Sequence, residues 1–74
     1  MSKADKMFEE LGYKKTTDGN HDIAFYKYEK LFVENDTLIL IRFYAKGKEV
    51  WKNTIMTMEE LKAINIKCRE LKWI

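Results

Sequence analysis

The side chains that most often carry out catalysis or bind metals are few in this chain, and they lie far apart. His21 is the only histidine and Cys68 the only cysteine among the 74 residues. A lone histidine in a predicted loop, with no second ligand or nucleophile beside it, is more typical of solvated surface than of a reactive site. One cysteine can form neither an intramolecular disulfide nor a thiolate zinc cluster. The sequence therefore predicts no metal site and no cofactor.

The paired carboxylates and the glycines also match structural roles better than catalytic ones. The acidic pairs at positions 9–10 and 59–60 are expected in first or second turns of helices, where the helix dipole favours negative charge. The glycines at positions 12, 19 and 47 are too dispersed for a phosphate-binding loop. A chain this short leaves little room for a concave pocket. We therefore expect no catalytic residue and a protein that is not an enzyme.

Length and composition favour one small domain, residues 1–74. A hydrophobic content of 46% allows a packed core, and 35% charged residues suit a soluble surface. The net charge of +2 is low for a protein that binds phosphate backbones. The first residues are charged and periodic, and no apolar run approaches the roughly 18 residues that suggest a membrane span. With a single cysteine, these features predict a cytoplasmic protein without a membrane segment.

The N-terminal residues predict a short helix. Ser2 and Asp5 form a plausible cap, and Ala4, Met7, Phe8 and Leu11 make one apolar stripe. Gly12 is placed to end the helix in a left-handed conformation, with Tyr13 packing back on the last turn. Residues 14–22 are expected to form an exposed loop around the turn at residues 18–20, although Lys14 and Lys15 can begin a short extended segment.

The middle of the chain predicts three strands. Residues 37–44, TLILIRFY, are the most β-prone run and are apolar on both faces, which indicates a central strand. Residues 23–33 and 49–53 are expected to flank it, with turns at residues 34–36 and 45–48. Gly47 is expected to supply positive φ in the second turn. The result is a three-stranded antiparallel meander.

The C-terminal residues predict the clearest element, a helix over residues 58–71. Thr57 and Glu60 have the spacing of a capping box, and Met56 and Leu61 that of a hydrophobic staple. The apolar stripe consists of Leu61, Ile64, Cys68 and Leu71. Because Cys68 lies on this stripe, we expect it to be a small core residue rather than a reactive thiol.

Together these elements predict an α+β fold in the order α-β-β-β-α, in which the helices cover one face of the sheet and the C-terminal helix is the main cover. The expected core consists of Met7, Phe8, Leu11, Ile23, Phe25, Ile39, Ile41, Phe43, Val50, Leu61, Ile64, Cys68 and Leu71. Alternation along the strands then places Tyr26, Tyr28, Leu40, Arg42, Tyr44 and Trp51 on the opposite, open face.

Three interpretations of that open face follow from its composition. The first is a protein-binding module that associates with itself or with a host or phage protein, because Tyr, Trp and Arg concentrate binding energy at interfaces. The second is a single-stranded nucleic-acid binder that stacks bases on the aromatic rings, with Arg42 and Lys52 nearby, which the low net charge disfavours. The third is that a longer helix or the tail at residues 73–74 covers both faces, so that the aromatic residues belong to the core. The candidate binding residues are Tyr26, Tyr28, Arg42, Tyr44 and Trp51.

The two ends of the chain carry a resemblance to known proteins. The segments KADKMFEELGYKK and TMEELKAINIKCRELKW resemble a group of short uncharacterised proteins encoded by phages and prophages of Gram-positive bacteria. The resemblance covers about forty of the 74 residues, in cap-and-helix patterns rather than catalytic signatures. It implies a phage-type accessory protein in a bacterial cytoplasm, and it transfers no functional residue.

Overall fold

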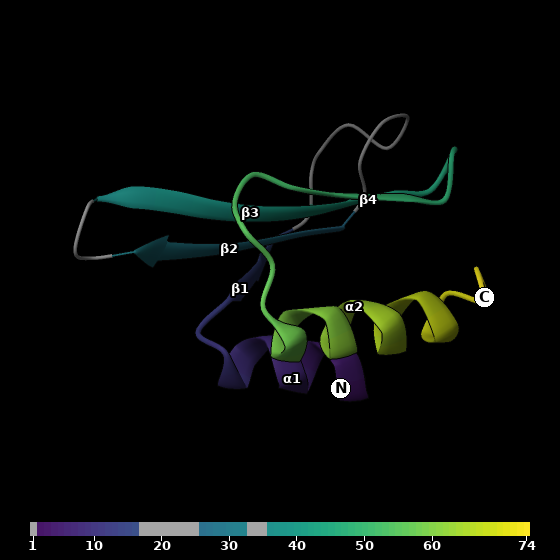
Figure 1. The fold of residues 1–74 in the computed structure, drawn as a ribbon. Coiled ribbons are helices and arrows are strands. Elements are labelled where there is room, and N and C mark those ends of the chain that lie inside the picture. The colour runs from purple at the N-terminus through teal and green to yellow at the C-terminus, as the bar shows by residue number, and fades with distance from the viewer. Residues whose placement is uncertain (1, 17–25, 33–35) are drawn as a thin grey trace.

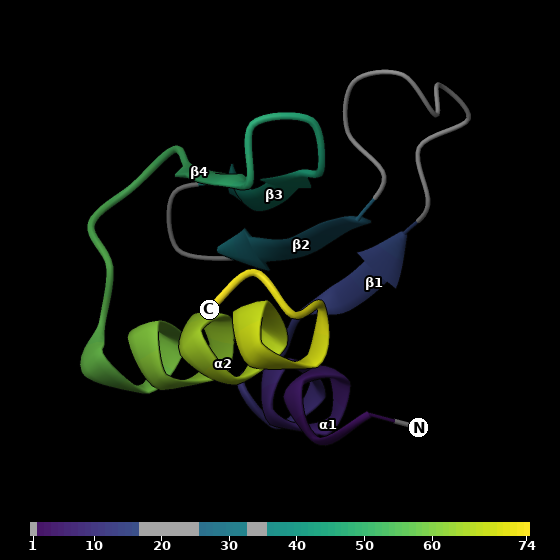
Figure 2. The same ribbon diagram turned by 90° about the vertical axis from the view of Figure 1, so that its right-hand side faces the viewer.

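The computed structural model describes residues 2–16, 26–32 and 36–74 and shows two layers, a sheet and a pair of helices. In chain order the elements are α1 (Lys3–Glu10), β1 (Lys14–Thr16), β2 (Tyr26–Phe32), β3 (Thr37–Tyr44), β4 (Glu49–Lys52) and α2 (Met58–Glu70). The strands form an antiparallel sheet in the order β1-β2-β3-β4. Both helices lie side by side on the same side of this sheet (Figures 1 and 2). The α+β class and the meander are confirmed.

One strand was not counted in the predicted meander, although a short extended segment was allowed for at Lys14 and Lys15, where it lies. β1 pairs with β2, with Lys14 opposite Glu29 and Lys15 opposite Tyr28. A three-residue segment that contains two lysines has little β propensity of its own, so its pairing with β2 decides its conformation. The sheet therefore has four strands rather than three. The predicted turn at residues 18–20, His21, and the expected core residues Ile23 and Phe25 lie outside the described residues, as does most of the turn at residues 34–36.

The register divides the sheet into two faces. Directly paired residues share a face, so Tyr26 with Phe43, and Tyr28 with Ile41, lie together. The inner face, toward the helices, carries Lys15, Tyr26, Tyr28, Lys30, Ile39, Ile41, Phe43, Val50 and Lys52. The outer face carries Lys14, Thr16, Lys27, Glu29, Leu31, Leu38, Leu40, Arg42, Tyr44, Glu49 and Trp51.

The placement of Tyr26 and Tyr28 on the open face was wrong. Tyr28 is 1% exposed, and its ring stacks on that of Phe8 with the centroids 4.1 Å apart. The hydroxyl of Tyr28 donates a hydrogen bond to the Oδ1 atom of Asp5 in α1. A buried tyrosine needs such a partner for its hydroxyl, and α1 supplies it.

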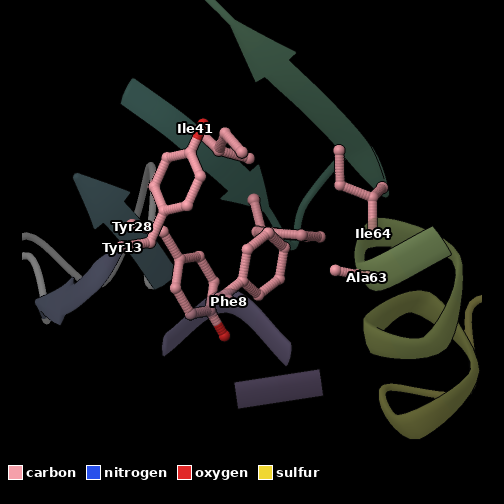
Figure 3. Packing of buried hydrophobic residues seen from close by; sticks show 7 residues of the cluster. Phe8, Tyr13, Tyr28, Ile41, Ala63 and Ile64 are labelled. Carbon is pink, nitrogen blue, oxygen red and sulfur yellow. The ribbon is translucent and has the colours of Figure 1, made fainter. Parts of the chain in front are cut away.

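The core is built around the aromatic side chain of Phe8 (Figure 3). In addition to its stacking on Tyr28, the Phe8 ring makes edge-to-face contacts with Tyr13 and Phe43. From the other helix, Ala63 and Ile64 complete the buried cluster. The core prediction holds for Phe8, Ile41, Phe43 and Ile64, which are buried, and for Met7, Leu11, Ile39, Val50, Cys68 and Leu71, which are partly buried against them.

The expected core residue Leu61 is 46% exposed, so its assignment was wrong. α2 instead turns Glu60, Ala63, Ile64 and Lys67 inward. Two of these are charged, and each has an ionic partner, Lys52 for Glu60 and Asp5 for Lys67, so the burial of their charges is compensated. An apolar stripe alone could not reveal this orientation.

The helix starts confirm the sequence analysis. The Ser2 hydroxyl accepts a hydrogen bond from the backbone N–H of Asp5. At α2, the Thr57 hydroxyl accepts from the Glu60 N–H, and the Glu60 carboxylate accepts from the Thr57 N–H, which is the predicted capping box. Positions 9 and 10 fall in the last turn of α1, so the helix-dipole argument for that acidic pair was wrong.

Both helices end with the same backbone motif. In α1, Gly12 has a φ of 92°, and the N–H of Tyr13 donates to the carbonyl of Phe8. In α2, Lys72 takes the position of the glycine with a φ of 62°, and the N–H of Trp73 donates to the carbonyl of Cys68. The end of α1 was predicted, whereas a lysine in the left-handed region was not.

The turn between β3 and β4 shows a similar difference. The residue with positive φ there is Lys48, at 52°, rather than the expected Gly47.

Among the described residues, no helix is long and apolar enough to cross a membrane.

Candidate functional site

The outer face of the sheet gathers large apolar side chains at one end of the β2–β3 hairpin. Leu31 and Leu38 are directly paired there and are 55% and 44% exposed. Leu40, the next outward residue of β3, is half-buried. We call Leu31, Leu38 and Leu40 the leucine patch. In the part of the chain that the structure describes, no element lies over this face, since both helices pack on the other one.

A second group of outer-face residues lies across the middle of the sheet. Lys27 is the direct partner of Arg42, and Arg42 is the direct partner of Trp51. The Arg42 guanidinium lies over the Trp51 ring, 5.1 Å from its centroid. Trp51 is 44% exposed, so the stacked pair is open to solvent on one side. We call Lys27, Arg42 and Trp51 the basic row.

Of the five predicted binding residues, three lie on the outer face. These are Arg42, Tyr44 and Trp51, whereas Tyr26 and Tyr28 are on the inner face. Leu40 was placed on this face, whereas Leu31 and Leu38 were not named among the open-face residues. The inward-facing residues of β2 were assigned from the apolar residues that precede the strand, and this assignment exchanged its two faces.

The inner face holds a charged cluster around Asp5. Its Oδ1 atom accepts hydrogen bonds from the Tyr28 hydroxyl at 2.5 Å and from Lys67 Nζ at 3.3 Å. Its Oδ2 atom accepts from Lys15 Nζ at 3.0 Å. Burial alone would raise the pKa of the Asp5 carboxyl, but these donors outweigh it and lower the pKa to about 2. Lys67 Nζ also lies 4.3 Å from the centroid of the Tyr26 ring.

A second cluster surrounds Glu60 at the start of α2. The Tyr13 hydroxyl donates to its Oε2 atom, and Lys52 Nζ lies 3.5 Å from Oε1. Burial would raise the pKa of Glu60, but the hydrogen bonds from Tyr13 and Thr57 and the charge of Lys52 lower it. Lys52, which the nucleic-acid interpretation had placed near the stacking residues, therefore points to the helices.

These two clusters have the properties of structural links rather than of a reactive site. Each joins a helix to the sheet, and every buried side-chain polar atom in the described residues has a hydrogen-bond partner. Burial raises the pKa of the Tyr13 and Tyr28 hydroxyls, and their hydrogen bonds to Glu60 and Asp5 raise it further. Both hydroxyls therefore stay protonated and act as donors. Burial also raises the pKa of the Cys68 thiol, which makes it a poor nucleophile. The described residues contain no group of three His, Cys, Asp or Glu side chains that could hold a metal ion.

The tail does not lie over the outer face. The Trp73 ring lies on the inner side, 6.2 Å from the Phe43 ring centroid. The suggestion that this part of the tail covers the second face was therefore wrong.

Comparisons with known proteins add no assignment: no protein-family model, curated protein or solved structure matches this chain.

Proposed function

We propose that this chain is a non-catalytic protein-binding module whose contact surface is the outer face of the sheet. The observation that carries the proposal is the exposure of Leu31, Leu38 and Trp51 on one sheet face. Contiguous exposed apolar residues beside polar ones are typical of interaction surfaces. Trp51 and Arg42 belong to the residue types that contribute most binding energy.

A single-stranded nucleic-acid binder is the alternative, and the inward orientation of two tyrosines weakens it. Tyr26 and Tyr28 face the helices, so Tyr44 and Trp51 are the aromatic residues left on the outer face in the described chain. One side of the Trp51 ring is already in contact with Arg42. Aliphatic side chains such as those of the leucine patch do not stack bases, but they do pack against protein.

The partner, in this proposal, is a host or phage protein or a second copy of the chain. The resemblance of both ends to phage and prophage proteins supports an accessory role in a bacterial cytoplasm. Self-association and binding to another protein use the same surface, so one set of variants tests both.

Leu38→Ser and Trp51→Ala are the variants that test the proposal. Each should abolish capture of the partner, or dissociate a homodimer seen by light scattering, and each should leave the unfolding midpoint nearly unchanged. Ile55→Ser is the matched control, because Ile55 is 92% exposed and lies outside the outer face. Equal effects of all three variants would contradict a specific outer-face surface. Unfolding by Trp51→Ala and Leu38→Ser would mean that these residues serve the fold instead.

A further inference from the structure

The basic row contains two cations that oppose each other directly, and no acidic residue is the direct partner of either. Lys27 and Arg42 are directly paired on the outer face, and like charges in this position destabilise a sheet. The row continues to Thr16 on one side and to Trp51 on the other, and neither is acidic. The fold therefore maintains a local repulsion here.

The lysines on the inner side of the sheet have partners within the chain. Lys15 and Lys67 pair with Asp5, and Lys52 pairs with Glu60. No such ion pair involves Lys27 or Arg42 within the described residues. On the covered side, the fourth lysine, Lys30, donates to the carbonyl of Leu11, whereas Lys27 and Arg42 at the centre of the open side have neither kind of partner within the described residues.

Two carboxylates do share the outer face, and each has a different neighbour. Glu29 is the direct partner of Lys14 on one side and of Leu40 on the other. Glu49 is the direct partner of Tyr44. Both flank the basic row, since Glu29 is two residues from Lys27 in β2 and Glu49 is two residues from Trp51 in β4, but neither is directly paired with a cation of the row.

The contact with Trp51 holds the Arg42 guanidinium on the outer face, 5.1 Å from the ring centroid. A cation–π contact uses the face of the ring and none of the N–H donors of the guanidinium, and a planar guanidinium can bind a carboxylate through two of these donors. Arg42 and Lys27 are both half-buried. An ion pair formed there is less screened by water than one between fully exposed side chains.

The leucine patch lies along the strands from this centre. Leu40 and Leu38 precede Arg42 in β3 by two and four residues, and each step of two residues spans roughly 7 Å. A segment of protein that carries one carboxylate and apolar side chains at alternate positions would match both groups at once.

We propose that the outer face binds a protein segment in which an aspartate or glutamate is followed by apolar residues. Its carboxylate lies between Lys27 and Arg42, and its apolar side chains pack on the leucine patch. This inference rests on the protein-binding role proposed above and names the chemistry of the partner. A nucleic acid would offer phosphates to the same cations, but it has no counterpart for the leucine patch.

The test is a titration of the isotope-labelled protein, followed by amide chemical shifts. The probes are an oligothymidine and three end-blocked peptides with leucine at every second position after the first residue: Glu-Ser-Leu-Ser-Leu (the Glu-Leu peptide), Gln-Ser-Leu-Ser-Leu (the Gln-Leu peptide) and Lys-Ser-Leu-Ser-Leu (the Lys-Leu peptide). The Glu-Leu peptide should shift the amides of β2 and β3 around the basic row and should bind at least about tenfold more tightly than the Gln-Leu peptide, since a hydrogen bond to a charged group contributes about 1.5–3 kcal/mol. The Lys-Leu peptide should not bind.

Variants separate the charged part of the surface from the apolar part. Lys27→Gln and Arg42→Gln should each remove most of the preference for the Glu-Leu peptide, while the Gln-Leu peptide binds as before. Lys46→Gln, in the exposed turn after β3, is the control and should have no effect. Leu38→Ala should weaken both peptides.

The outcomes distinguish this inference from the proposed function. If the Glu-Leu and Gln-Leu peptides bind the outer face equally well, the inference is overturned and the protein-binding role stands. If the oligothymidine shifts the basic row and no peptide does, both are overturned. If the Glu-Leu peptide causes no outer-face shifts at all, the inference fails, and the capture experiment decides on the proposed function separately.

Discussion

Replacing Tyr28 by phenylalanine isolates the hydrogen bond that joins β2 to α1. The ring of Tyr28 stacks on Phe8 with 4.1 Å between the centroids, and Tyr28→Phe keeps that contact. The change removes the hydroxyl that donates to Asp5 Oδ1 at 2.5 Å. Any loss of stability therefore reports on the hydrogen bond rather than on packing.

The size of the loss follows from what remains around Asp5. A hydrogen bond to a charged group contributes about 1.5–3 kcal/mol. Lys15 and Lys67 still donate to the carboxylate in the variant, so no unpaired buried charge is left. We therefore expect the free energy of unfolding at about pH 6 to fall by an amount near the lower limit, roughly 1.5 kcal/mol.

The same substitution should change the response to acid. Burial acts to raise the pKa of Asp5, but the bond from Tyr28, the bond from Lys15 and nearby positive charge lower it from 3.8 to about 2. A carboxyl whose folded pKa is below its unfolded pKa contributes stability above the unfolded value, and that contribution is lost as pH falls toward the folded value. The window is therefore between pH 3.8 and about pH 2. Tyr28→Phe removes part of this contribution, so the difference between the two proteins should shrink as the pH falls through that window.

Urea denaturation followed by tryptophan fluorescence, at several pH values from about pH 6 downward, measures both effects. Tyr44→Phe is the matched control, because Tyr44 is half-buried on the outer face and should change stability by less than about 0.5 kcal/mol. A loss for Tyr28→Phe that is the same at every pH, or no loss at all, would refute the coupling of this hydroxyl to the Asp5 charge.

Three further predictions concern the core and the helix ends. Ile41→Ala should lower the free energy of unfolding by about 2–5 kcal/mol because Ile41 is fully buried, and a loss below about 0.5 kcal/mol would contradict its place in the core. Thr57→Ala should cost about 1 kcal/mol, with Thr57→Ser close to neutral, because the hydroxyl accepts from the Glu60 N–H; equal losses would refute the cap. Lys72→Gly should stabilise by roughly 0.5–1 kcal/mol because it relieves a left-handed lysine, whereas Lys62→Gly inside α2 should destabilise by about 1 kcal/mol; destabilisation by both would contradict this account. Chemical denaturation measures all of these changes.

The parts of the fold that sequence could predict depend on local signals. β3 was predicted with its observed bounds because apolar, β-branched and aromatic residues form one run that only Arg42 interrupts. The capping box of α2 and the left-handed Gly12 depend on residues within a few positions of each other. Such local patterns can be recognised in the sequence without knowledge of the tertiary structure.

The parts that sequence could not predict depend on distant partners. Tyr28 turns inward because α1 supplies Asp5 to its hydroxyl, and these residues are 23 positions apart. Lys67 is buried because it meets the same carboxylate, 62 positions away. β1 forms on β2 despite its lysines. For the outer face of the sheet, alternation correctly placed Arg42, Tyr44 and Trp51, but because the two faces of β2 were exchanged, Leu31 was not assigned to it.

The side chain of Asn53 forms hydrogen bonds with the backbone of β3 next to the leucine patch. Its side-chain amide donates to the carbonyl of Leu38 at 2.8 Å and accepts from the N–H of Leu40 at 2.9 Å, directly after β4 ends. The Asn53 side chain therefore fills two hydrogen-bonding positions on β3. Without it, these positions would be open to a longer β4 or to a strand from another molecule. An apolar hairpin beside an unpaired strand edge is a template for aggregation. Because Asn53 occupies these two backbone groups of β3, a strand from another molecule cannot pair with them, although Leu31 and Leu38 keep their side chains exposed.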